Sequence, residues 1–235
     1  MRQETGSRTG CARQSGRLGP AWSAPRTVVV VPGVRWWGVI SSVGSPVLLA
    51  GGWTVAASLQ PRGFNPVADT ISVLAGVGAA DRWVMTWALV GVGACYIVTA
   101  LALRPAARSG RLILLAVGVA TMLVAANPVH DGHGGSLPHT VWAAAGFIAM
   151  TAWPLAGRVR GPRVPYGLRP AVAACATAVL LVLLVWFGTE LIFAGRQVGL
   201  AERVMALAQA VWPLAVVLTC YHAANGLPGE SETPG

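Results

Sequence analysis

Long apolar runs separated by short polar loops dominate the chain from residue 36 onward. Each run approaches the roughly 20 residues that a helix needs to cross the hydrocarbon core of a bilayer. The six runs lie at about 36–59, 83–103, 112–129, 138–157, 171–194 and 204–222. The pattern therefore predicts an all-α fold, a polytopic membrane helical bundle with six transmembrane helices.

A polar, turn-rich segment, Phe64 to Leu74, follows the first apolar run directly. Asn65 suits a helix N-cap and Pro66 suits the first helical turn. A helix that starts there would carry apolar residues at i, i+4 and i+7 on one face and polar residues on another. We therefore predict a short helix near residues 66–75 that lies at the outer surface of the membrane.

Composition agrees with a membrane protein. Hydrophobic residues make up 54% of the 235 residues and charged residues only 11%, whereas about a quarter of a soluble domain is charged. The net charge of +9 comes entirely from Arg, with no Lys in the chain. These Arg residues lie mainly in the N-terminal segment and in the loops between the apolar runs. The charge therefore indicates orientation in a lipid bilayer, and we expect no nucleic acid partner.

The Arg residues alternate between the two sides of the predicted membrane. Most lie before the first run or in the loops after the second and fourth runs. The other loops hold only Arg62, Arg82, Arg196 and Arg203. Positively charged loops stay in the cytoplasm, so we expect a multi-pass protein of the cell membrane with both termini cytoplasmic.

The two ends of the chain differ from the membrane domain, which we place at residues 35–223. Residues 1–34 are rich in Arg, Gly, Ser and Pro, which is typical of a disordered cytoplasmic tail. An over-extended gene start is the alternative, since no Met follows until Met85. Residues 224–235 are predicted to form a second disordered cytoplasmic tail.

One polar cluster could hold a metal ion. His130, Asp131, His133 and His139 lie within ten residues, and neutral imidazoles with a carboxylate suit a divalent metal such as zinc. The alternative is a solvated, Gly-rich loop whose last residue, His139, leads into the fourth run. An ionisable residue inside a membrane helix favours a functional role, so His139 is the most interesting of the four.

Other polar residues gather on the same predicted side of the membrane. The catalytic candidates are Asp69, Ser72, His139 and Glu202, and the ligand-binding candidates are Asn65, Asp69, Glu190 and Arg203. The alternatives are a helix cap at Asp69 and Ser72, and an interfacial ion pair at Glu190. Buried ionisable groups tend to find each other or water, so we expect Asp69, His139, Glu190 and Glu202 to form one cluster.

Three segments together carry a resemblance to a known family. They are Phe64 to Leu74 after the first run, the loop from Pro128 through His139, and Gly199 to Arg203 before the last run. Over roughly residues 36 to 223, the chain resembles the bacterial multi-pass membrane proteins catalogued as domain of unknown function 998. The resemblance implies a six-span integral membrane protein and implies no activity.

Three hypotheses for function stay open. The first is a membrane protein that binds a lipid, a small ligand or a partner at its outer face. The second is an intramembrane lipid hydrolase or transferase with an outer-facing polar site, although the sequence contains no standard catalytic motif. The third, a small-solute transporter, has the least support because the two halves show no recognisable repeat. The sequence does not indicate an oligomeric state.

Overall fold

The computed structural model describes residues 33–61, 63–130 and 136–225. Nearly all of the two predicted tails lies outside these residues. The described part contains seven α-helices and one 3₁₀ helix, η1. They are α1 (Trp36–Ser58), α2 (Ile71–Leu74), α3 (Trp83–Ala102), α4 (Arg108–Ala126), α5 (Leu137–Gly157), η1 (Tyr166–Leu168), α6 (Pro170–Ile192) and α7 (Val198–Asn225).

Six of the helices are long and apolar enough to cross a membrane, which confirms the predicted fold class. The largest differences from the prediction are at the starts of α4 and α7, which begin at Arg108 and Val198 rather than near residues 112 and 204. Helix α4 carries Arg108 and Arg111 in its first turn, and α7 carries Glu202 and Arg203 just after its first turn. Such residues lower the hydropathy that defines a span but do not prevent backbone hydrogen bonding, so the helix extends beyond the apolar run.

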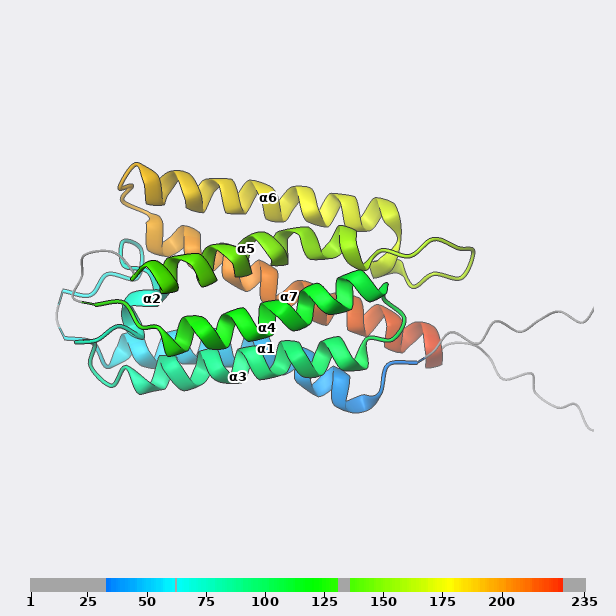
Figure 1. The fold of residues 1–235 in the computed structure, drawn as a ribbon, viewed down its shortest axis with the longest axis horizontal. Coiled ribbons are helices and arrows are strands. Elements are labelled where there is room, and N and C mark those ends of the chain that lie inside the picture. The colour runs from blue at the N-terminus through cyan, green and yellow to red at the C-terminus, as the bar shows by residue number, and fades with distance from the viewer. Residues whose placement is uncertain (1–32, 62, 131–135, 226–235) are drawn as a thin grey trace, which may run out of the picture. The chain divides into compact units, whose positions relative to one another are not determined.

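The long helices form a closed ring. Each of α1, α3, α4, α5 and α6 packs against the next long helix in the chain, and α7 packs back against α1 (Figure 1). Successive long helices run in opposite directions, so α1 begins and α7 ends at the same end of the bundle. The opposite end, where α2 lies, is called the α2 end below.

Glycines allow neighbouring helices to approach closely. A Cβ atom added to Gly93 of α3 would lie 2.6 Å from the carbonyl oxygen of Gly118 in α4. Gly110 of α4 faces the backbone of Gly157 in α5 in the same way. Membrane helices associate through such van der Waals contact because lipid provides no hydrophobic force between them.

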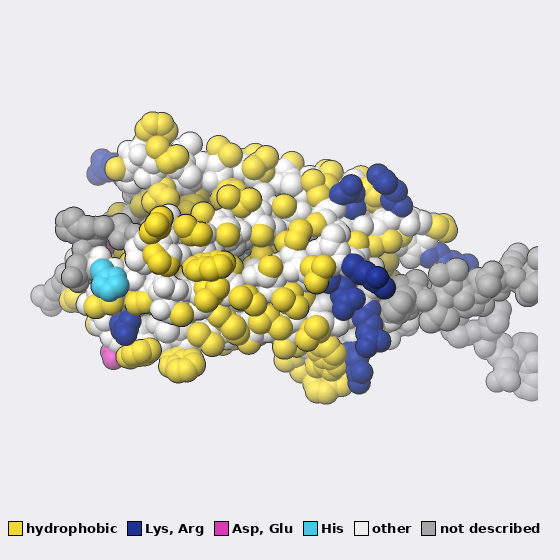
Figure 2. Space-filling model, viewed as in Figure 1, with side chains coloured by type: hydrophobic (Ala, Val, Ile, Leu, Met, Phe, Trp, Pro, Cys, Tyr) yellow, Lys and Arg dark blue, Asp and Glu magenta, His cyan; other side chains and the backbone are white. Residues whose placement is uncertain are grey.

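The surface of the bundle has the pattern of an integral membrane protein. Apolar side chains cover the sides of the helices, and Arg side chains gather at the end away from α2 (Figure 2). Helix α6 is the least buried of the six long helices. Its apolar residues on the outside include Val182 and Ile192. These features identify the protein as multi-pass and transmembrane.

The short helix at the α2 end is present but shorter than predicted. Residues 66–68 form a turn, and the helix starts only at Ile71. The Asn65 side chain caps this turn instead of a helix, since its Oδ1 accepts the Val67 N–H at 3.0 Å. Ile71 and Leu74 are both buried. The short helix therefore packs into the end of the bundle with its apolar face inward.

Candidate functional site

The segment before α2 is held against the first turn of α7. The Leu200 N–H donates to the Val67 carbonyl at 3.0 Å. Gly199 lies against the Asp69 carbonyl so closely that a side chain there would collide with it. Two stretches more than 130 residues apart thus meet, because α7 offers a backbone face without a Cβ at this point.

Arg203 stabilises the same contact between the segment before α2 and α7. Its Nη1 donates to the carbonyl oxygens of Pro66 and Asp69, both at 2.7 Å, and to that of Gly199 at 2.9 Å. Its guanidinium also lies 5.9 Å from the centre of the Phe64 ring. Within the segment, the Asp69 carboxylate accepts the Asn65 N–H at 2.7 Å. Asn65, Asp69 and Arg203 therefore fix the position of α2.

Glu202 is one turn inside α7 and is only 3% exposed. Its Oε2 accepts the N–H of Ile71, and its Oε1 lies 3.4 Å from the Ser72 hydroxyl. Ile71 N–H belongs to the first turn of α2, where helix N–H groups lack an intrahelical partner. The docking of α2 therefore places a buried carboxyl against an N–H group that needs an acceptor.

His139 continues this chain of hydrogen bonds from α5. Its Nε2 lies 3.2 Å from the Ser72 hydroxyl, and its Nδ1 lies 2.9 Å from the carbonyl oxygen of Asn127. The side chain is 6% exposed. Ser72 thus stands between an imidazole and a carboxyl that come from different helices.

The chemistry of these groups determines where protons reside. A carbonyl oxygen only accepts, so His139 Nδ1 must carry a proton, and the Ser72 hydroxyl can donate to only one of its two neighbours. When Ser72 donates to His139 Nε2 at 3.2 Å, Glu202 Oε1 at 3.4 Å lies beyond the usual O–H···O distance, and the Glu202 carboxyl is held by the Ile71 N–H.

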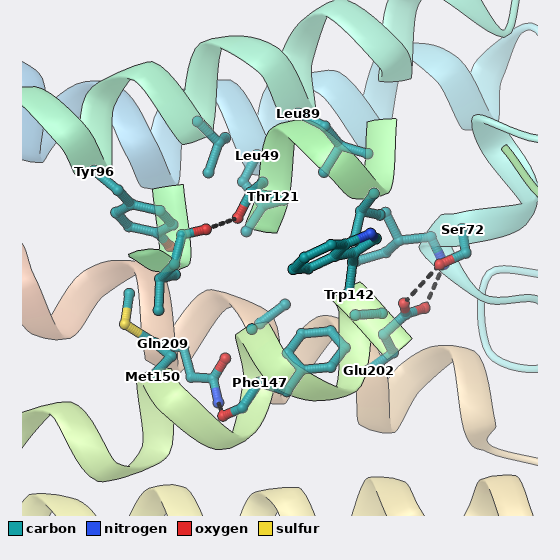
Figure 3. Close-up of a pocket in the computed structure, with 17 residues that line it drawn as sticks. Leu49, Ser72, Leu89, Tyr96, Thr121, Trp142, Phe147, Met150, Glu202 and Gln209 are labelled. Atoms are coloured by element: carbon teal, nitrogen blue, oxygen red, sulfur yellow. Dashed lines mark hydrogen bonds between the residues drawn. The ribbon is translucent and has the colours of Figure 1, made fainter. Parts of the chain in front are cut away.

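A cavity of about 90 Å³ opens beside Glu202 inside the ring of helices. Roughly 10–15 Å³ suffices for one water molecule, so the cavity has room for several. Its walls are mostly apolar, and Ser72 and Glu202 lie at one end of it (Figure 3). The lining comes from every long helix except α6: Leu49, Ile71, Ser72, Leu89, Val92, Tyr96, Val117, Thr121, Val124, Trp142, Ala143, Gly146, Phe147, Met150, Glu202, Ala206 and Gln209.

The structure brings together some of the residues that the sequence singled out and separates others. Ser72, His139 and Glu202 form one hydrogen-bonded chain. Glu190 does not join it, because its carboxylate accepts the Gln197 N–H at 2.9 Å in the turn between α6 and α7. The Asp69 carboxylate likewise binds within its own segment. The expected single cluster of four ionisable residues is therefore wrong.

The candidate metal ligands are not assembled in the part of the chain that the structure describes. His130 is exposed, and Asp131 and His133 lie outside the described residues. Among the described residues no three His, Cys, Asp or Glu side chains are close enough to share a metal ion. Both ring nitrogens of His139 already have hydrogen-bond partners.

Most residues that line the cavity, in particular Tyr96, Trp142 and Gln209, are not among the candidates predicted from the sequence. Gln209 carried a usable signal, because a polar amide in the middle of a membrane helix needs a partner or a cavity. It is 3% exposed, and its Nε2 donates to the Phe147 carbonyl at 3.0 Å. Tyr96 and Trp142 carried no comparable signal, because aromatic residues are common in membrane helices as packing or interfacial groups.

The fold and the site define a six-helix integral membrane protein with a buried polar centre and a cavity near one end. The chain belongs to a family described as a protein of unknown function (DUF998), whose model matches residues 42–219. The match includes every residue of the hydrogen-bonded chain and of the cavity. Comparisons with curated proteins and with solved structures found no match.

Proposed function

We propose that this protein binds a lipid or another small amphipathic ligand in the cavity at the α2 end. The supporting observation is the cavity itself, whose apolar walls end at the polar side chains of Ser72 and Glu202. Ligand sites commonly combine apolar walls with a few fixed polar groups. The apolar part of the ligand would lie among Leu89, Val117 and Met150, and its polar group would face Glu202.

We also propose that the α2 end faces outward, with both termini in the cytoplasm. The Arg-rich end of Figure 2 supports this orientation, because loops rich in Arg stay in the cytoplasm. In a variant without native Cys, Gln197→Cys at the α2 end should react with a membrane-impermeant thiol reagent in whole cells. Pro162→Cys at the other end should not react.

Filling the cavity tests ligand binding. Ala143 lines the cavity, and Ala145 lies two residues further along α5 and is exposed on the outside of the bundle. Ala143→Phe should abolish binding of a fluorescent single-chain lipid to the purified protein, and the matched control Ala145→Phe should bind like the wild type. Equal binding by both variants would show that the lipid does not occupy the cavity.

A second candidate function is hydrolysis or transfer of an acyl group on a lipid. The contact of the Ser72 hydroxyl with His139 Nε2 favours it, because an imidazole held by a carbonyl at Nδ1 can take the proton of a serine nucleophile. Ser72 Oγ would attack the ester carbonyl, His139 would pass the proton to the leaving alcohol, and water or a second alcohol would release the acyl group. Labelling by a fluorophosphonate probe that is lost in Ser72→Ala is the expected result. Absence of labelling in the wild type would contradict this function.

A further inference from the structure

The polar groups around the cavity determine what kind of ligand head fits there. Glu202 is the only lining residue with an ionisable acid, and the described lining contains no Arg, Lys or His. A negatively charged head would therefore meet a buried carboxyl with no cation among the lining residues, which is costly in apolar surroundings. The lining disfavours phosphate and carboxylate heads.

The uncharged polar side chains add mainly acceptor oxygens. Both protons of the Gln209 amide have partners, since Nε2 donates to the Phe147 carbonyl at 3.0 Å and to Thr151 Oγ1 at 3.1 Å. Thr121 donates its hydroxyl proton to the Val117 carbonyl at 2.9 Å. Each keeps an oxygen that can accept from a ligand. Tyr96 and Trp142 can donate, but neither carries a positive charge.

Aromatic rings complete the lining in a way that suits a cation. Tyr96, Trp142 and Phe147 come from α3 and α5 and all border the cavity (Figure 3). The face of an aromatic ring attracts a positive charge, and the attraction grows when water is excluded. Trp142 lies toward the Ser72–Glu202 end of the cavity and Tyr96 lies toward the opposite end, so the carboxyl and the Trp142 ring are the groups nearest to a head at Glu202 (Figure 3).

We infer that the cavity binds an amphiphile with an ammonium head, which lies beside the carboxylate of Glu202. The inference rests on the proposed ligand binding and specifies its chemistry. A bound cation interacts best with the ionised carboxylate, so the ligand and a proton compete at Glu202.

Among the residues that the structure describes, few charged or titratable groups lie near Glu202. Ser72 contacts it from α2, and His139 of α5 contacts Ser72. Arg203 follows it on α7, but its Nη1 donates to the carbonyl oxygens of residues 66, 69 and 199. The cavity residues from α1, α3 and α4 include no Asp, Glu, His, Lys or Arg. A change of charge at Glu202 therefore acts on Arg203, on His139 through Ser72, and on a bound ligand.

Three probes with a ten-carbon chain and different heads test the cation preference separately from ligand binding itself: decyltrimethylammonium, decanol and decanoate. Binding is measured by equilibrium dialysis against the full chain in lipid nanodiscs, with empty nanodiscs subtracted. We expect decyltrimethylammonium to bind about tenfold or more tightly than decanoate at pH 7. Because its quaternary head cannot titrate, its affinity should rise with pH by up to about tenfold per unit while the site loses one proton.

Glu202→Gln is the matched variant, because Gln can still accept the Ile71 N–H. It should remove both the preference for the ammonium head and the dependence of its affinity on pH. Asp81→Asn removes an exposed acid at the same end and should change neither. If Glu202→Gln does not fold, the pH dependence measured with the wild type still tests the inference.

The outcomes distinguish the inference from the proposed function. Equal binding of all three probes by the wild type would support a ligand cavity and overturn the preference for a cation. A preference that persists in Glu202→Gln would also overturn the inference. Failure of all three probes to bind would overturn both the inference and the proposed ligand binding.

Discussion

Two glutamates at the α2 end, Glu202 and Glu190, show how similar sequence surroundings lead to different roles. Each lies near the end of an apolar run, and each carboxylate accepts a backbone N–H. The partner of Glu190 is Gln197, seven residues away in the turn between α6 and α7. The partner of Glu202 is Ile71, which is 131 residues away. Glu190 therefore shapes a local turn, whereas Glu202 joins two distant parts of the chain.

Burial separates the two regions further. Glu202 is covered by α2 and borders the cavity, whereas the bond of Glu190 to Gln197 lies at the exposed surface. A buried carboxyl has a large effect on its surroundings because water does not screen it. The contrast shows that the candidate site depends on how α2 docks onto α7. Pairs of matched substitutions, one in each region, test this dependence.

The largest effect is expected at Gly199, compared with Gly188 in α6. A Cβ at Gly199 would collide with the carbonyl of Asp69 and would lie 2.8 Å from that of Pro66. Both are backbone atoms, so Gly199→Ala should lower the free energy of unfolding by about 1–3 kcal/mol or more. A Cβ at Gly188 meets nothing within 4 Å, so Gly188→Ala should be neutral or stabilising. Thermal unfolding in detergent measures both, and equal midpoints would contradict the close contact at Gly199.

A smaller difference is expected between Glu202→Ala and Glu190→Ala. Removal of the Glu202 carboxyl leaves the Ile71 N–H without its partner in a buried position. An unsatisfied buried donor costs about 1–3 kcal/mol. The Gln197 N–H can instead donate to water, so Glu190→Ala should lower the free energy of unfolding by less than about 1 kcal/mol. Unfolding midpoints of the two variants in the same detergent provide the comparison, and a larger loss for Glu190→Ala would reverse our assignment of the two roles.

The membrane bundle follows from the sequence because its signals are local. Each span is visible in a window of about 20 apolar residues, and the structure contains all six predicted spans. The start of α7 was misplaced because Glu202 and Arg203 lower the hydropathy of its first turns. A partner far away in the sequence, such as Ile71 for Glu202, can stabilise a charged residue in a helix, and a hydropathy window does not detect this partner.

The site is only partly visible in the sequence. Ser72, His139 and Glu202 could be chosen as candidates because polar and ionisable residues in or beside apolar runs are energetically costly and are often functional. Their connection could not be derived, since it depends on α2 packing against α7 and on Asn127 offering its carbonyl to His139. Glu190 carried the same signal as Glu202, and only the fold of the α6–α7 turn distinguishes them.

The smallest effect is expected for Arg203→Lys, compared with Arg196→Lys. Lys keeps the positive charge of Arg203, but its side chain ends one bond short of the position of Nη1, so its ammonium group does not reach all three carbonyl oxygens equally well. Loss of one net hydrogen bond corresponds to about 1 kcal/mol of unfolding free energy. Arg196 is exposed, so its replacement by Lys should change stability by less than about 0.5 kcal/mol.

The same pair separates the charge of Arg203 from its hydrogen bonds. If the hydrogen bonds hold the segment before α2, Arg203→Lys should expose that segment to faster hydrogen exchange at Leu200, whose N–H donates to Val67. Arg196→Lys should leave this exchange unchanged. If Arg203→Lys also exchanges at the wild-type rate, the positive charge near Glu202 is sufficient, and Gly199 with Glu202 would then account for the docking of α2.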